Sequence, residues 1–246
     1  MSGHSKWKTI KHQKGAADIK RGMAFTKLAN AITIAVKQGG GGADPDSNPR
    51  LRLAMDAARA QNMPKENIQR AIDRGAGKGG GEELHEATYE GFAPEGVNVI
   101  VEATTDNPQR TSAEVKNMFE KNGGSFGQPG SSSYLFKRVG EIYVDKNGKT
   151  YDDVFSAALD SGAEDIEEEG NEVAVYTQTG DLARVKDELT NKGFGVTSAK
   201  LAMRPLTKIT VGKKEEYEKV LDFLSTLEDL DDVQEVYSNL DTSNSQ

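Results

Sequence analysis

The spacing of apolar positions divides the chain into a helical first part and a mixed second part. Between residues 16 and 38, apolar side chains recur every three or four positions, which predicts an amphipathic helix. Asn48 before Pro49 matches an N-cap followed by proline at the first helical position, so we expect a second helix to about residue 61. Pro64 opens a third helix, which we expect to end at Gly75 in the C′ position. Three short amphipathic helices predict a small helical domain.

A glycine-rich linker at residues 75–81 separates this domain from a region in which strands alternate with helices. We expect the first strands there near 86–92, 97–104 and 133–137, with a helix near 108–121. A second set follows, with strands at 141–145, 164–168, 172–177 and 195–203 and helices at 151–161 and 180–191. The chain closes with a short strand near 207–211, a helix near 213–228 and a strand near 232–237.

The order of these elements predicts an insertion. The second set reads β-α-β-β-α-β, which is the order of a ferredoxin-like unit. The elements before and after it are incomplete alone, so we expect them to share one sheet. The predicted fold is a multidomain α+β protein with an N-terminal three-helix domain and two ferredoxin-like domains, the third inserted into the second. The predicted domains span residues 1–80, residues 82–138 with 205–240, and residues 139–204.

Charge is distributed very unevenly along the chain, whose net charge is −8. Residues 1–80 carry 15 basic and 6 acidic side chains, a net charge of +9, and residues 81–246 carry 16 basic and 33 acidic ones, a net charge of −17. Such an asymmetry indicates a segment that meets a polyanion, attached to a body that does not. The alternative is a solvated basic face without a partner.

Several classes of site find no support in the sequence. The chain contains no cysteine, which excludes disulfides, thiol catalysis and cysteine–zinc sites. Its three histidines lack metal-ligand spacing, and the glycines of the linker follow a helix, not the strand that a dinucleotide-binding loop requires. We therefore expect no catalytic site, no cofactor and no metal. With neither an export signal nor a membrane span, a cytoplasmic location is expected.

The candidate binding residues lie in the basic N-terminal part. Residues 1–15 have little hydrophobic periodicity and predict a flexible segment, here called the basic arm. Trp7 lies between two lysines, and an aromatic ring among cations can stack on an unpaired base while its neighbours neutralise phosphates. Anchoring of the arm to the body is an equally good interpretation of Trp7. The predicted contact residues are Lys6, Trp7, Lys8, Lys11, His12, Lys14, Lys20, Arg21, Lys27, Arg52, Lys65 and Arg70.

Short motifs along nearly the whole chain resemble the YebC family. They are Gly3-His4-Ser5-Lys6-Trp7, Ile10-Lys11-His12, Phe25-Thr26-Lys27-Leu28, Asn62-Met63-Pro64-Lys65, Tyr89-Glu90-Gly91, Thr105-Asp106-Asn107, Arg110-Thr111, Gly123-Gly124 and Asp231-Asp232-Val233-Gln234. The resemblance implies the same three-domain arrangement as the element order. Since the first motif begins almost at Met1, we expect no mitochondrial presequence. Met23 and Ala24 depart from the family pattern, which leaves one family cation missing.

Two functions remain open at this point. The resemblance implies a DNA-binding transcriptional regulator, whereas mitochondrial members of the family are translational activators. The alternative is therefore a translation factor that binds ribosomal or messenger RNA, with the ribosome as a partner. Basic side chains serve both functions, because phosphate contacts carry no sequence information. Neither function involves a membrane.

Overall fold

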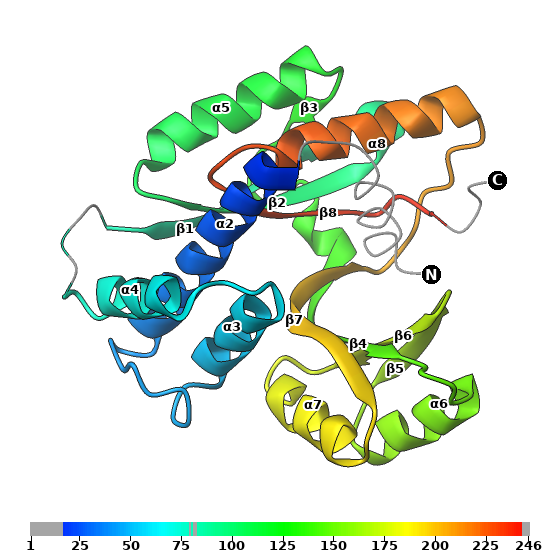
Figure 1. Ribbon diagram of the computed structural model, residues 1–246. Coiled ribbons are helices and arrows are strands. Elements are labelled where there is room, and N and C mark those ends of the chain that lie inside the picture. The colour runs from blue at the N-terminus through cyan, green and yellow to red at the C-terminus, as the bar shows by residue number, and fades with distance from the viewer. Residues whose placement is uncertain (1–16, 79, 81–82, 243–246) are drawn as a thin grey trace. The chain divides into compact units, whose positions relative to one another are not determined.

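The computed structural model describes residues 17–78, 80 and 83–242 (Figure 1). The chain divides into two compact units. One unit contains the described residues up to Ser133 together with Gly212–Tyr237, and the other contains Tyr134–Val211 and the described residues from Ser238 onward.

The N-terminal part is a three-helix domain. Its helices are α2 (Ala17–Gln38), α3 (Pro49–Ala60) and α4 (Lys65–Gly75). Asn48 caps α3 as expected: its side chain accepts a hydrogen bond from Leu51 N at 3.0 Å. The core between the helices is apolar and consists of Ile32, Ala35, Val36, Leu51, Met55, Ala58, Met63, Ile68, Ala71 and Ile72.

Gly75 has a different role from the one its position predicted. It lies inside α4, and the left-handed glycine after the helix is Gly77, with φ of 75°. A Cβ atom at position 75 would lie 2.6 Å from Thr33 O and 2.7 Å from Val36 Cβ. Glycine is therefore required at position 75 because α2 and α4 approach closely there.

The second domain is a four-stranded sheet with two helices. The strands are β1 (His85–Phe92), β2 (Asn98–Thr105), β3 (Ser125–Phe126) and β8 (Val233–Ser238), in the order β3-β1-β2-β8. The helices are α5 (Pro108–Lys121) and α8 (Lys214–Glu228), and a 3₁₀ turn (Pro94–Gly96) joins β1 to β2. The Phe119 ring of α5 makes edge-to-face contacts with Phe126 of β3 and Phe223 of α8, at centroid distances of 5.9 and 5.2 Å.

The predicted insertion is confirmed by the sheet order. Strand β8 lies beside β2 although the whole inserted domain separates them in the sequence. At the end of β2, Thr104 N donates a hydrogen bond to Asp232 O at 2.8 Å. The α+β fold with one domain inserted into another is thus as expected, while the predicted boundaries between domains stay a prediction.

The inserted domain is a complete ferredoxin-like unit. Its elements are β4 (Phe136–Asp145), α6 (Tyr151–Asp160), β5 (Asp165–Glu169), β6 (Glu172–Thr177), α7 (Leu182–Asn191) and β7 (Gly195–Pro205). The strand order is β5-β6-β4-β7, and each neighbouring pair is antiparallel. Helix α7 packs so closely on β4 that a Cβ atom at Gly140 would lie 2.8 Å from Leu182 Cβ. The face of the sheet that includes Gly140 is therefore the helix-covered face.

Three expected strands differ from those observed. The segment near 133–137 begins as a 3₁₀ turn (Ser133–Leu135), and its last two residues belong with the segment 141–145 to one strand, β4, which runs through Gly140 without a break. The strand that completes the first β-β-α-β series is the two-residue β3, which is too short to leave a periodic signal. The segment near 207–211 forms only an isolated bridge between Ile209 and Leu240.

Candidate nucleic-acid interface

The structure describes the side chains of five of the predicted contact residues. Arg21 and Lys27 lie on α2, Arg52 lies on α3, and Lys65 and Arg70 lie on α4. Lys20 lies in the first turn of α2, but its side chain is outside what the structure describes. The other predicted residues also lie outside the described part of the chain: Lys6, Trp7, Lys8, Lys11, His12 and Lys14.

Helix α4 presents basic side chains because its apolar residues all point to the core. Ile68, Ala71 and Ile72 are buried, so Lys65 and Arg70 are left on the exposed surface. Arg70 Nη2 donates to Asn67 Oδ1, and neither Arg70 nor Lys65 forms an ion pair within the described residues.

Two further cations of the helical domain are exposed. Arg21 on α2 is exposed and has no ion pair among the described residues. Lys78, which is not among the predicted contact residues, is likewise exposed beyond the end of α4 and has no ion pair among the described residues. The signal that could have identified Lys78 is its position in a glycine-rich segment, where no bulky neighbour covers it. Arg21, Lys65, Arg70 and Lys78 can therefore approach an anion without first breaking an ion pair.

Other basic side chains of this domain already have partners. Lys27 Nζ donates to Glu228 O at 2.7 Å, at the end of α8. Lys37 Nζ donates to Leu84 O at 3.0 Å and pairs with Glu83. The hydrogen bond from Lys37 lowers the pKa of Glu83. Arg50 and Glu86 form an ion pair at 2.6 Å. Lys27, Lys37 and Arg50 thus connect the helical domain to the second domain. Arg52, another predicted contact residue, is half-buried on α3.

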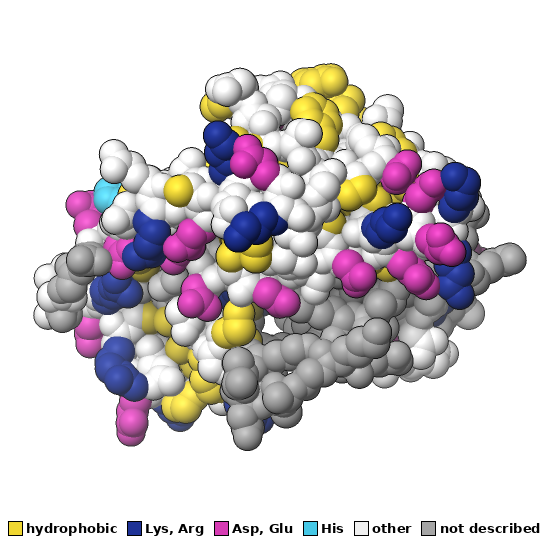
Figure 2. Space-filling view, turned by 90° about the horizontal axis from the view of Figure 1, so that it is seen from above, with side chains coloured by type: hydrophobic (Ala, Val, Ile, Leu, Met, Phe, Trp, Pro, Cys, Tyr) yellow, Lys and Arg dark blue, Asp and Glu magenta, His cyan; other side chains and the backbone are white. Residues whose placement is uncertain are grey.

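The second domain presents a different kind of charged surface. In the view of Figure 2, Lys and Arg side chains alternate with Asp and Glu side chains, and no field of one sign forms. Ion pairs on the helices of this domain mix the two signs in the same way, such as Lys116 with Glu120 at 3.8 Å and Lys213 with Glu216 at 2.7 Å. A mixed surface attracts a polyanion poorly, since the charges cancel over a short distance.

A buried carboxylate organises the loop that leads into the inserted domain. Glu90 of β1 is 8% exposed and accepts backbone hydrogen bonds from Gly130 at 2.9 Å, Ser132 at 2.7 Å and Ser133 at 2.8 Å. Burial alone would raise the pKa of Glu90, but these hydrogen bonds outweigh it and hold the pKa below its ordinary value. Glu90 is therefore a structural anion that fixes the loop.

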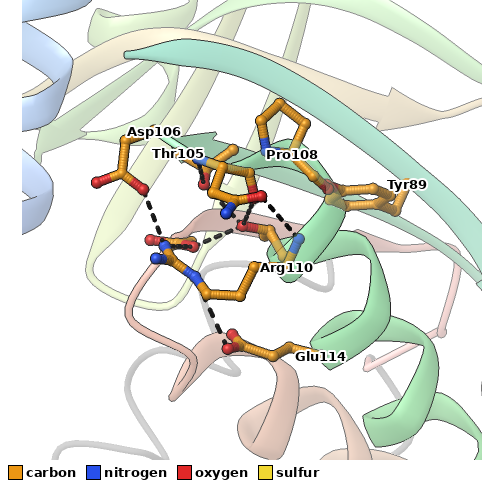
Figure 3. Close-up of polar contacts among 9 residues, drawn as sticks. Tyr89, Thr105, Asp106, Pro108, Arg110 and Glu114 are labelled. Carbon is orange, nitrogen blue, oxygen red and sulfur yellow. Dashed lines mark hydrogen bonds and ion pairs between the residues drawn. The ribbon is translucent and has the colours of Figure 1, made fainter. Parts of the chain in front are cut away.

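A second polar cluster joins the two separate parts of the second domain (Figure 3). Asp232, just before β8, accepts hydrogen bonds from Thr111 Oγ1 at 2.6 Å and from Arg110 Nη2 at 2.8 Å. Arg110 also contacts Asp106 at 3.1 Å and Glu114 at 3.9 Å. Burial opposes the ionisation of Asp232, yet the two hydrogen bonds lower its pKa. The cluster fastens the start of α5 to the start of β8, and its cation, Arg110, is paired.

The described residues provide no metal site and no membrane span. Nowhere in the described ranges do three His, Asp or Glu side chains come together as metal ligands would. None of the helices in those ranges is both long and apolar enough to cross a membrane.

Known protein families match the chain over nearly its whole length. Residues 5–78 match the family description "TACO1/YebC protein N-terminal domain", and residues 84–240 match "TACO1/YebC second and third domain". A relative from Trichlorobacter lovleyi is 47% identical over 99% of this chain and 97% of its own length. One from Roseiflexus castenholzii is 49% identical over 98% and 95%. Both bear the name "Probable transcriptional regulatory protein".

A solved structure agrees with the fold. The crystal structure of a conserved hypothetical protein from Aquifex aeolicus is 41% identical and superimposes with a TM-score of 0.87. The match covers 96% of this chain and 97% of the Aquifex chain. The three domains and the inserted arrangement are thus shared with an experimentally determined relative.

Proposed function

The chain belongs to the TACO1/YebC family, and from this we propose that it is a non-catalytic, nucleic-acid-binding regulator of gene expression that acts on DNA as a transcriptional regulator. The names of the relatives from Trichlorobacter lovleyi and Roseiflexus castenholzii support the regulatory part of the proposal. We propose the cytoplasm as its location.

The observation that carries the proposal is the segregation of charge. Positive charge is concentrated before residue 81, and Arg21, Lys65, Arg70 and Lys78 there are exposed without ion pairs in the described part of the chain. A protein that neutralises phosphates releases counterions, and each contact then adds about 0.9 to the slope of log K against log salt on duplex DNA.

The test compares two charge-matched triple variants. Changing Arg21, Lys65 and Arg70 to Ala should weaken binding to a duplex of arbitrary sequence and flatten the salt slope by about 2 to 3. The control removes three exposed lysines from the mixed surface of α5 and α8, namely Lys116, Lys121 and Lys219. It changes net charge equally, so its slope should stay that of the parent protein. Equal slopes for the two triple variants would contradict an interface on the helical domain.

The arm is tested separately. Changing Lys6, Lys8, Lys11 and Lys14 to Ala should flatten the slope by up to about 3 if all four lysines contact phosphate. An unchanged slope would exclude the arm from the interface.

A second candidate function, an RNA-binding translation factor that acts at the ribosome, is favoured by the surface of α4. Its exposed side carries Glu66 and Asp73 among the cations, and Gln69 Nε2 is engaged by Asp73 at 3.1 Å. Because Asp73 holds the Gln69 side chain, Gln69 is not free to read a base edge in a DNA groove. Binding to irregular RNA does not require a single helix to read base edges in a groove.

Trp7 distinguishes the two candidates. Single-stranded or looped RNA offers free base faces, and one aromatic stack is worth about 1–3 kcal/mol. Trp7→Ala should therefore weaken binding to structured RNA or ribosomes about tenfold and leave duplex binding nearly unchanged if the translational candidate is right. A loss confined to the duplex would favour the transcriptional function.

A further inference from the structure

Helix α6 of the inserted domain exposes two large hydrophobic side chains. Phe155 is 38% exposed and Leu159 is 47% exposed. They lie four positions apart, and Tyr151 lies four positions before Phe155, so the three side chains form one row along the helix. The side chains that attach α6 to the core of the domain are different ones, Val154 and Ala158, which are buried. We call the row of Tyr151, Phe155 and Leu159 the α6 stripe.

Contacts within the inserted domain hold the start of the α6 stripe in place. The rings of Tyr151 and Phe155 contact each other at a centroid distance of 5.7 Å. Tyr151 Oη also donates a hydrogen bond to Ile166 O of β5 at 3.4 Å. The stripe is therefore formed before any partner binds, which lowers the ordering cost of an association.

A row of polar and acidic side chains runs beside the α6 stripe. Residues 150–183 carry ten acidic and no basic side chains. Two of the acidic ones, Asp152 and Asp160, lie on α6 with Ser156 between them, and all three are exposed. Neither aspartate forms an ion pair with a described residue. The exposed side of α6 thus combines an apolar row with a row that keeps its negative charge.

This combination selects among the possible occupants. Nucleic acid does not fit, because its phosphates are repelled by the acidic row. Two copies of the chain do not fit stripe to stripe, because Asp152 and Asp160 of one copy would face those of the other. The helical domain of a second copy has the right charge, but its described residues expose no large hydrophobic side chain that could cover Phe155 and Leu159.

The neighbouring strand indicates that the occupant is a helix. Strand β5 lies at the edge of its sheet, where an extended peptide could in principle add. The backbone of Ile166 is already engaged there, since its N donates to Asp165 Oδ1 at 2.9 Å and its O accepts from Tyr151. An added strand would have to break these bonds. A helix needs no backbone partner, and its own side chains at a spacing of three or four residues match a row of the same spacing.

We propose that the α6 stripe binds a cationic amphipathic helix of another protein. The apolar side of that helix covers Phe155 and Leu159 over about two turns, and the adjoining Lys or Arg side chains pair with Asp152 and Asp160. An exposed apolar row with a polar border is typical of such an interaction site. The inserted domain is thereby a protein-binding module, and its docking does not depend on the nucleic-acid binding proposed above.

The test uses the full-length protein without nucleic acid and a labelled peptide of about 18 residues built from Leu and Lys in a helical amphipathic pattern. Fluorescence anisotropy should show binding at least about tenfold tighter than that of a scrambled peptide of the same composition. Changing Phe155 and Leu159 together to Ala should weaken binding at least about tenfold. The matched control changes Tyr134 and Leu206, exposed hydrophobic residues outside the stripe, to Ala and should bind like the parent protein. Equal affinities of the two double variants would overturn the proposal.

A single exchange guards against loss of the fold. Leu159→Lys alters an exposed position of α6 with a good helix former, and its ammonium group repels a cationic helix. It should weaken peptide binding as much as the double variant does. Binding of parental strength in Leu159→Lys would contradict the proposal.

The acidic row is tested by its effect on the salt dependence. Changing Asp152 and Asp160 to Asn should weaken peptide binding about threefold or more at low salt and flatten its dependence on salt. The charge-matched control changes Glu215 and Glu218, which are exposed on α8, to Gln and should keep the parental salt dependence. Equal salt dependence of the two variants would contradict pairing with the acidic row.

Sedimentation velocity at low salt tests the alternative that a second copy covers the stripe. The parent protein and the variant with Ala at positions 155 and 159 should sediment alike. Self-association that occurs in the parent protein and is lost in this variant would overturn the proposal.

Discussion

Replacing Glu90 with glutamine should loosen the loop that leads into the inserted domain. Glutamine has nearly the shape of glutamate, but it exchanges one acceptor oxygen for an NH₂ group and removes the charge. The two oxygens of Glu90 now serve three backbone amides, Gly130 N on Oε1 and Ser132 N and Ser133 N on Oε2. Glu90→Gln therefore leaves at least one of these buried or half-buried amides without an acceptor and weakens the others.

The expected loss of local stability follows from these three hydrogen bonds. A hydrogen bond to a charged group contributes about 1.5–3 kcal/mol, and a buried donor left unpaired costs about 1–3 kcal/mol. Since the loop relaxes in part, we expect a loss of about 2–4 kcal/mol in the local free energy of opening. This corresponds to an increase of about 30-fold to several hundredfold in amide hydrogen exchange.

The assay is hydrogen exchange of the 127–133 segment at pH 7, followed by mass spectrometry. Glu86→Gln is the matched control, because Glu86 lies on the same strand and forms an exposed ion pair with Arg50. Such surface pairs contribute about 0–1 kcal/mol, so exchange in the loop should stay at the parent rate. Equal exchange in the parent protein and Glu90→Gln would refute the view that this carboxylate holds the loop.

The pH dependence of stability supplies a second test of Glu90. Because the folded pKa is lowered, the contribution of Glu90 is fully present above its ordinary pKa of 4.5 and is lost as the pH falls through the lower folded value. The difference in urea stability between the parent protein and Glu90→Gln should accordingly be largest near neutral pH and shrink below about pH 4.5. A difference that grows on acidification would contradict the lowered pKa.

Three further substitutions test the packing described above. Gly75→Ala should destabilise the helical domain by about 1–3 kcal/mol through overlap with Thr33 and Val36, whereas Gly22→Ala in the open middle of α2 should be neutral or stabilising by up to about 1 kcal/mol in thermal denaturation. Phe119→Ala should cost about 3–5 kcal/mol in urea unfolding, because the ring is fully buried; a loss below 1 kcal/mol would mean that the site collapses around the gap. Asp232→Asn should cost about 1–3 kcal/mol at pH 7 and progressively less as the pH falls below the ordinary pKa of 3.8, in the same assay.

The helices could be predicted because the residues that mark their ends lie within a few positions of each other. The inserted arrangement could be predicted from the order of the elements along the chain. Asn48 and Pro49 mark the start of α3 within two residues, and the order of strands and helices was sufficient to place β8 with β2. Gly140 and β3 show where local signals fail. Glycine in a strand suggests an interruption, yet Gly140 is present because Leu182 lies against it from a helix far along the chain.

The binding residues could be predicted only as a class. Lys27 and Arg21 carry the same charge on the same helix, but Lys27 donates to a carbonyl 201 residues away, whereas Arg21 is exposed. Nothing near either residue in the sequence distinguishes them.

The position of β8 late in the chain delays completion of the second domain's sheet during synthesis. Strand β2 ends at Thr105 and its neighbour β8 starts at Val233, so the ribosome must add the 127 intervening residues (106–232) before it reaches β8. At about 5–20 residues per second, this takes roughly 6–25 s. Throughout that interval the edge of β2 is unpaired around Val99, Ile100 and Val101, which are fully buried in the finished protein. The inserted domain is continuous in sequence, so it can fold before β8 is synthesised. A chain that ends before Val233 leaves the edge of β2 unpaired, where it can pair with a strand of another chain and aggregate.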